Sequence, residues 1–148
     1  MAVKNVLGTV ATAVAAGGLA NKQLAGLIDG RVKAMIDSYT SDASEDAGST
    51  IKFGRTVPTG ANVIAVLLAC STAQAAVTIS VGDSGSGRSA KYASASTAFQ
   101  SGAASLLAAL DTGHVVGSVA SDNQILVTTA GATLAVGVWT AVILYTLD

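Results

Sequence analysis

The segment Asn62–Cys70 reads NVIAVLLAC and is almost continuously apolar. It follows a turn-like stretch around Pro58, the only proline in the chain. A short apolar run of this kind is typical of a β-strand that is buried on both faces, because neither set of alternate side chains is suited to water. The run therefore predicts a strand inside an all-β fold.

Further short strands are expected on both sides of this run. Residues 32–39, VKAMIDSY, alternate as a half-buried strand does, with Val32, Ala34 and Ile36 on one face and Lys33, Met35 and Asp37 on the other. The remaining strands are expected at 49–53, 76–81, 90–95, 114–119, 124–129 and 136–146. Residues 96–111 have a helical composition interrupted by Gly102, and there we expect a loop with a short helix. Closely spaced short strands predict an all-β sandwich or barrel.

The first thirty residues differ in texture from the rest. They are rich in alanine and glycine and show no sustained hydrophobic period. We predict an N-terminal arm over residues 1–30 and a β-sandwich domain over residues 31–148. An apolar arm with so little pattern is expected to be ordered by contact with a neighbour, and a frayed tail is the alternative. The candidate assembly interface consists of its larger apolar side chains, Val3, Val6, Leu7, Val10, Leu19, Leu24, Leu27 and Ile28.

Charged residues are scarce. They make up 11% of the chain, against about 25% in typical soluble domains. A compact monomer of 14.5 kDa would expose roughly 7,000 Å², and eight basic and nine acidic residues would have to serve that surface. The shortage indicates that something else, a protein chain or a membrane, covers part of it.

Two uncharged stretches bear on the membrane alternative. Residues 5–21 superficially resemble a secretory signal, but Leu7 is the only leucine before the glycine pair, which makes a poor hydrophobic region. Residues 123–147 are long enough to span a bilayer, but polar residues and glycines interrupt them and two short strands fit better. We expect no membrane partner, so the charge deficit points toward assembly.

The sequence Gly82-Asp83-Ser84-Gly85 matches the loop around the nucleophilic serine of trypsin-like proteases. A catalytic triad also needs a base and an orienting acid beside that serine. The only histidine, His114, lies downstream of Ser84, whereas that family has it upstream. A hairpin turn that uses the positive φ open to glycine is the favoured interpretation, and a small hydrolase using Ser84 is the weaker alternative.

Other motifs are equally incomplete. Residues 85–90, GSGRSA, fit the relaxed dinucleotide pattern G-x-G-x-x-A, but the residues that follow make a poor helix opening. Asp42, Glu45 and Asp46 could in principle gather a hard cation, although a solvated acidic loop is the simpler interpretation. Cys70 is the only cysteine, which excludes an internal disulfide, and we expect it to be a small buried hydrophobe. The basic residues are scattered and the net charge is −1, so no nucleic-acid partner is expected. We predict no catalytic residue, no cofactor and no metal.

From Arg31 onward the chain resembles small proteins encoded beside the major capsid gene of tailed bacteriophages. The resemblance is carried by blocks in a fixed order: RVKAMIDSYT, GSTIKFGRTVPTGANVIAVLLA, TISVGDSGSGRSAKYASAS and DNQILVTTAGATLAVGVWTAVILYTLD. Members of that group are similar to head cement, or decoration, proteins of jelly-roll or sandwich fold. The resemblance implies a β-sandwich of the jelly-roll type and no catalytic residue, and the first thirty residues lie outside it.

The resemblance also implies a function and partners. We expect a non-enzymatic virion protein that is made in the cytoplasm of the bacterial host and lies on the capsid exterior. Its expected partners are further copies of itself, as a homodimer or homotrimer, and the major capsid protein. The alternative is a receptor- or carbohydrate-binding module of a tail fibre or spike, with Trp139 accompanied by Tyr39, Tyr92 and Tyr145 as candidate stacking residues.

Overall fold

The computed structural model describes residues 32–147 except 86, 103–104 and 111–123. The described residues form β-strands joined by turns and loops, and none of them is helical. The strands are β1 (Lys33–Ser41), β2 (Thr50–Phe53), β3 (Ala61–Cys70), β4 (Thr78–Asp83), β5 (Ala93–Ser96), β6 (Leu106–Leu110), β7 (Ile125–Ala130) and β8 (Gly137–Leu147).

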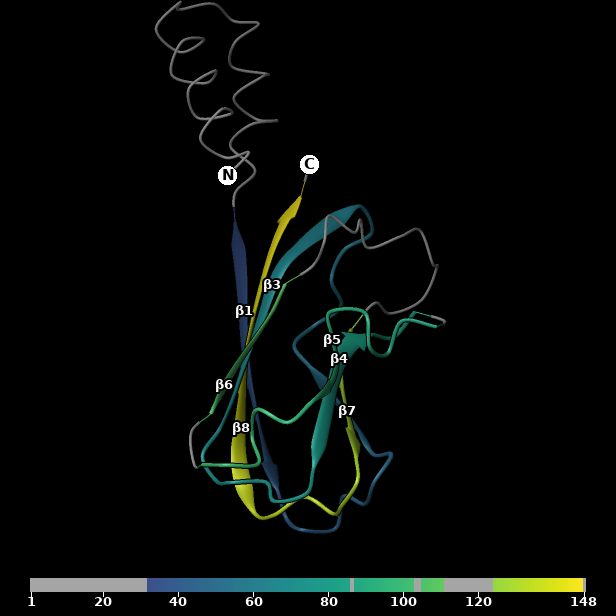
Figure 1. The fold of residues 1–148 in the computed structure, drawn as a ribbon. Coiled ribbons are helices and arrows are strands. Elements are labelled where there is room, and N and C mark those ends of the chain that lie inside the picture. The colour runs from purple at the N-terminus through teal and green to yellow at the C-terminus, as the bar shows by residue number, and fades with distance from the viewer. Residues whose placement is uncertain (1–31, 86, 103–104, 111–123, 148) are drawn as a thin grey trace, which may run out of the picture.

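The strands make two four-stranded sheets that face each other (Figure 1). Sheet I has the order β1-β8-β3-β6 and sheet II the order β2-β7-β4-β5. Every pair of hydrogen-bonded neighbours is antiparallel. The expected all-β sandwich is therefore confirmed. The chain passes between the sheets so that strands distant in sequence become neighbours, which is compatible with the jelly-roll type of sandwich.

The expected strands match the described ones except in one segment, and one expected strand lies outside the described residues. The short helix expected within residues 96–111 is wrong, because residues 106–110 form β6. The helical composition of this leucine- and alanine-rich segment is overridden by pairing, since β6 completes one edge of sheet I beside β3. The strand expected at 114–119, which contains His114, lies outside the described residues.

The core lies between the inner faces of the two sheets. Its largest fully buried side chains come from both sheets and from the loops that close the sandwich: Trp139, Phe53, Phe99, Leu68, Ile79, Ile125, Leu134 and Ile143. Cys70 is a free thiol and 2% exposed, as expected of a small buried hydrophobe. Deep burial of large aromatic and branched side chains gives most of the free energy that holds the two layers together.

Gln74, a fully buried polar residue, fastens its own loop to two other loops at one end of the sandwich. Its side-chain oxygen accepts a hydrogen bond from the amide of Ala135 at 2.9 Å. Its backbone amide donates to the carbonyl of Phe99 at 2.7 Å. The β3–β4, β5–β6 and β7–β8 connections are thus held together, and the buried amide has the partners that burial requires.

The predicted N-terminal arm, residues 1–30, lies outside the described residues. The same holds for every side chain of the candidate interface from Val3 to Ile28. The domain boundary and the role of the arm therefore stay predictions.

Candidate functional site

The outer face of sheet I is built from apolar side chains that lie opposite one another on neighbouring strands. Ile36 of β1 is the register partner of Val142 of β8. Val142 in turn lies opposite Leu67 of β3, and Leu67 lies opposite Ala108 of β6. This row crosses the whole sheet. A parallel row consists of Ala34, Leu144, Ala65 and Leu110.

Several of these side chains are open to solvent in the described structure. Ile36 is 74% exposed, Leu110 64% and Leu106 63%. A β-bulge between Val63 and Ala65 adds to the face. Because a bulge inserts one extra residue into its strand, Ile64 also reaches solvent and is 39% exposed.

The outer face of sheet I carries no acidic or basic side chain at any outward position of its four described strands. The outward residues that are not large and apolar are small or hydroxyl- and amide-bearing: Ala34, Ser38, Thr40, Asn62, Ala65, Ala69, Ala108, Thr140 and Thr146. We call this surface the apolar face. A contiguous apolar surface of this kind marks an interaction site rather than an ordinary solvent boundary.

The outer face of sheet II provides an internal comparison. Its outward positions are mostly hydroxyl-bearing or charged, as at Thr50, Lys52, Thr78, Ser80 and Thr128. Every exposed large apolar residue among the described ones lies on a strand of sheet I or immediately before one: Val32, Ile36, Ile64, Leu106, Leu110, Val136 and Val138. The asymmetry singles out one side of the sandwich for contact with another molecule.

The expectation that β3 is buried on both faces therefore needs correction. Its inner side chains, such as Val66 and Leu68, are fully buried, but Ile64 is exposed and Leu67 and Ala69 are half-buried. Within residues 32–147, as far as the structure describes them, only one face of β3 is fully covered. The continuous apolar run of residues 62–70 is explained if a second molecule covers the other face.

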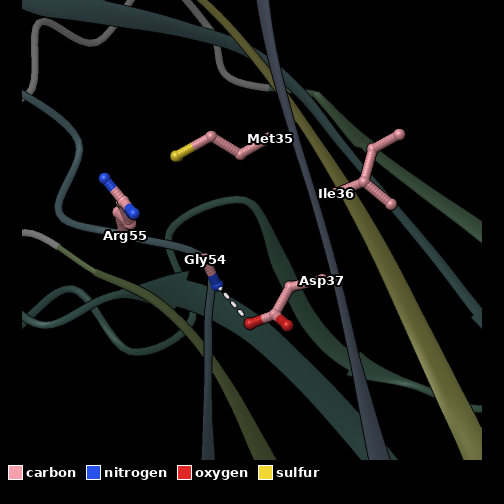
Figure 2. Close-up of a pocket in the computed structure, with 5 residues that line it drawn as sticks. All are labelled: Met35, Ile36, Asp37, Gly54 and Arg55. Carbon is pink, nitrogen blue, oxygen red and sulfur yellow. Dashed lines mark hydrogen bonds between the residues drawn. The ribbon is translucent and has the colours of Figure 1, made fainter.

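A groove of about 370 Å³ lies at the open edge between the sheets, lined by Met35, Ile36, Asp37, Gly54 and Arg55. Figure 2 shows Met35 and Asp37 pointing from β1 toward Gly54, whereas Ile36 points to the opposite side of the strand. The Asp37 carboxylate accepts a hydrogen bond from the Gly54 amide at 2.8 Å. Asp37 therefore ties the edge of sheet I to the end of β2, and Ile36 belongs to the apolar face.

The side chains of Asp83 and Ser84, in the protease-like motif, make contacts that stabilise their loop. Asp83 is 1% exposed, and its Oδ2 lies 3.0 Å from Nη2 of Arg88 and 3.1 Å from the Tyr92 hydroxyl, which donates to it. Ser84 Oγ accepts a hydrogen bond from the Gln124 amide at 3.0 Å. Gly87 has a φ of +70°, as expected for a turn that uses glycine. His114, the only candidate base, lies outside the described residues.

The acidic loop residues bond to neighbours instead of pointing at a common centre. Asp42 accepts hydrogen bonds from the hydroxyl and amide of Ser44, which lower the pKa of its carboxyl. Thr133 donates to Asp46 at 2.8 Å. Glu45 accepts a hydrogen bond from the Tyr39 hydroxyl. No three histidine, cysteine, aspartate or glutamate side chains converge on one point within the described residues.

The aromatic residues of the carbohydrate-binding alternative do not form an open platform. Trp139 is fully buried and packs against Phe99, and Tyr92 and Tyr145 are buried as well. Tyr39 is half-buried and bonded to Glu45. A sugar would need an accessible ring face for stacking, and Trp139 offers none.

Sequence reasoning placed the candidate interface in the arm and missed the apolar face. A signal for it was present in the alternation of residues 32–39, which places Val32, Ala34 and Ile36 on one face of the strand.

No helix in the described part of the chain is long and apolar enough to cross a membrane.

Comparison with known proteins gives an informative structural likeness. No family model matches the chain, and no curated protein matches it. A chain of the capsid asymmetric unit of cyanophage Pam1 matches with a TM-score of 0.65 and 25% identity, over 80% of this chain and 86% of that one.

Other structural likenesses are weaker. A chain of the acid-stable capsid of Helicobacter pylori bacteriophage KHP30 matches with a TM-score of 0.40 and 17% identity, over 78% of this chain and 93% of that one. A chain of Bacillus endospore appendages matches with a TM-score of 0.30 and 12% identity, over 79% of this chain and 88% of that one. Scores this low do not establish a shared fold. The informative likeness is therefore the first: this all-β sandwich resembles a chain of a phage capsid.

Proposed function

We propose that this chain is a structural protein of a phage virion. More specifically, it is a cement, or decoration, protein that self-associates on the outside of the head and stabilises contacts between major capsid subunits. The observation that carries the proposal is the structural likeness to a chain of the Pam1 capsid asymmetric unit, which extends over 80% of this chain. The apolar face supports it, because a protein that works by covering neighbours needs such a surface.

The physical properties of the chain suit such a role. A surface without charges can be buried without the desolvation cost that unpaired ions carry. Its small and β-branched side chains lose little conformational entropy when they are held in an interface. Attachment in many copies to a repeating shell turns modest individual contacts into strong overall binding.

The proposal includes the absence of enzymatic activity. Asp83 and Ser84, which carry the protease-like motif, are engaged by Arg88, Tyr92 and the backbone of Gln124. These contacts stabilise a loop and give the serine no activating base among the described residues. As a virion component, the chain would be made in the cytoplasm of the bacterial host.

Binding to assembled shells tests the proposal. Heads that lack this protein are mixed with the purified full chain, and bound chain is measured by co-sedimentation and located by electron microscopy. We expect saturable binding at symmetric positions on the exterior, and shells that resist heat better than bare ones. Free major capsid subunits are the control and should bind weakly. Heads that stay bare at saturating concentrations of folded chain would sink the proposal. A folded chain that ignores shells but binds on a glycan array would favour the receptor-binding alternative.

A further inference from the structure

We propose that the apolar face is the surface through which two copies of this chain associate, face to face about a twofold axis. The inference deepens the proposed function, on which its biological role rests. It concerns a different surface from the N-terminal arm and names the second copy of the chain as the occupant.

The size of the apolar face is the first argument. Strands spaced about 4.8 Å apart and rising about 3.4 Å per residue give the paired part of sheet I a projected area of about 500 Å². This area covers the whole outer face, including its hydroxyl- and amide-bearing positions, and it is comparable to the largest apolar patches on monomers, which are often functional. Two copies would together bury about 1,000 Å², which reaches the lower range of specific interfaces. The face is therefore large enough for a dimer.

The absence of charge is the second argument, and it favours a second copy over other partners. In a twofold interface the same patch meets itself, so a charge near the axis would face its own copy, and a charge elsewhere would need an opposite charge on the same patch. No outward position of the described strands of sheet I carries a charge. Such a face can pair with itself without like-charge repulsion, whereas a partner with a charged surface would find nothing complementary in it.

The arrangement of side chains is the third argument. The largest apolar residues, including Val142, Leu67 and Leu144, lie in the middle rows of the sheet. Hydroxyl-bearing residues lie toward one end, as Ser38 and Thr40 do. An apolar centre with polar residues at its margin is the usual anatomy of a protein interface. Two sheets that pack by such faces lie about 10 Å apart, with their strands inclined by about 30°.

The test measures the mass of the full chain in solution as a function of concentration, by light scattering and sedimentation equilibrium. The variants are Ile36→Glu and Leu110→Glu, which place a carboxylate in each of the two apolar rows of the face, on side chains that are 74% and 64% exposed in the described structure. Such exposed positions tolerate substitution in the monomer. The matched control is Thr50→Glu, an exposed position on the outer face of sheet II.

We expect the unaltered chain and Thr50→Glu to be dimers. Each face variant should raise the dissociation constant by about a hundredfold or more, because burying an unpaired carboxylate costs several kcal/mol. The far-ultraviolet circular dichroism spectrum of each variant should match that of the unaltered chain, which would show that the fold is unchanged.

Three outcomes would overturn the inference. One is an unaltered chain that stays monomeric at about 100 μM, a concentration at which a dimer with a micromolar dissociation constant would predominate. Another is a trimer, which a twofold contact cannot make alone. The last is a dimer that both face variants leave intact, and deletion of residues 1–31 would then test the arm as the contact. The mass measurement uses no shells, so its outcome is independent of the shell-binding experiment. A chain that dimerises but does not bind shells contradicts the proposed function alone. A chain that binds shells as a monomer contradicts only this inference.

Discussion

The Phe99 ring meets the Trp139 ring edge to face, with centroids 5.1 Å apart and planes inclined at 64°. Phe99 belongs to the connection between β5 and β6, and Trp139 lies on β8. Both rings are essentially inaccessible to solvent. The pair therefore links the loop that leaves sheet II to a central strand of sheet I.

The first prediction concerns the strength of this ring contact. Phe99→Leu and Trp139→Leu, each of which removes one ring of the pair, should each lower the free energy of unfolding by about 1–4 kcal/mol. The double variant should lose less than the sum by about 0.5–1.5 kcal/mol, because the edge-to-face contact can be lost only once. Urea unfolding followed by circular dichroism measures all four proteins. Strict additivity would show that the rings share a core without interacting specifically.

The second prediction concerns Gly131, which follows β7 with a φ of +91°. A Cβ at this position would lie 2.4 Å from the carbonyl oxygen of Ala76. Gly48 has a similar φ of +93°, but a Cβ there would meet nothing within 4 Å. Gly48→Ala should cost about 1–2 kcal/mol from backbone strain alone. Gly131→Ala should cost at least about 1 kcal/mol more, from the clash.

Thermal or urea unfolding of the two glycine variants separates these contributions. The comparison isolates the close approach of two loops, since the backbone strain is common to both positions. Equal losses in Gly48→Ala and Gly131→Ala would mean that the Ala76 carbonyl moves aside without cost.

The third prediction is a pH dependence at Tyr39. The hydrogen bond to Glu45, with burial and the charges of Glu45 and Asp42, raises the pKa of Tyr39 to about 12. The usual tyrosine pKa of 10.0 applies to the unfolded chain. The native state therefore favours the protonated phenol, and its stabilising effect is complete below pH 10 and is lost as the pH rises toward 12.

The difference in absorbance at 295 nm between the unaltered chain and Tyr39→Phe follows this ionisation directly. Glu45→Gln should bring the Tyr39 pKa back toward its usual value, because the anionic acceptor is gone. A Tyr39 that titrates near pH 10 in the unaltered chain would contradict the hydrogen bond.

The fourth prediction concerns Ser84. Ser84→Ala removes the acceptor of the Gln124 amide and should cost about 0.5–1.5 kcal/mol of stability. A fluorophosphonate probe, which labels activated serines, should leave the unaltered folded chain unlabelled. Labelling that disappears in Ser84→Ala would instead revive the hydrolase alternative.

Much of the fold could be predicted from the sequence because strand patterns are local. Alternation in residues 32–39 and the apolar run of residues 62–70 each predict a strand without knowledge of neighbours. Residues 106–110 could not be assigned in this way. Their leucines and alanines suit a helix equally well, and only the long-range pairing of Leu107 with Leu68 makes them a strand.

The site was harder to predict than the fold for a physical reason. Alternation shows that Ile36 and Met35 lie on opposite faces of a strand, but it does not say which face meets the core. In the structure Met35 and Asp37 face inward beside Gly54, and Ile36 faces outward. The interface predicted in the arm remains a prediction, since those residues lie outside the described ones.

The place of β8 between β1 and β3 has a consequence for how the chain is made. Lys33 pairs with Tyr145, so β1, which is synthesised early, cannot form its strand pairing until residues 137–147 have been translated. Until then β1 has no partner strand in sheet I. The inner side chains of β3 also lack the core residues that β8 contributes. Folding that depends on such distant pairing is slow and leaves apolar segments open to chaperones or aggregation. A stop codon anywhere before β8 would therefore yield no sandwich at all, rather than a smaller one.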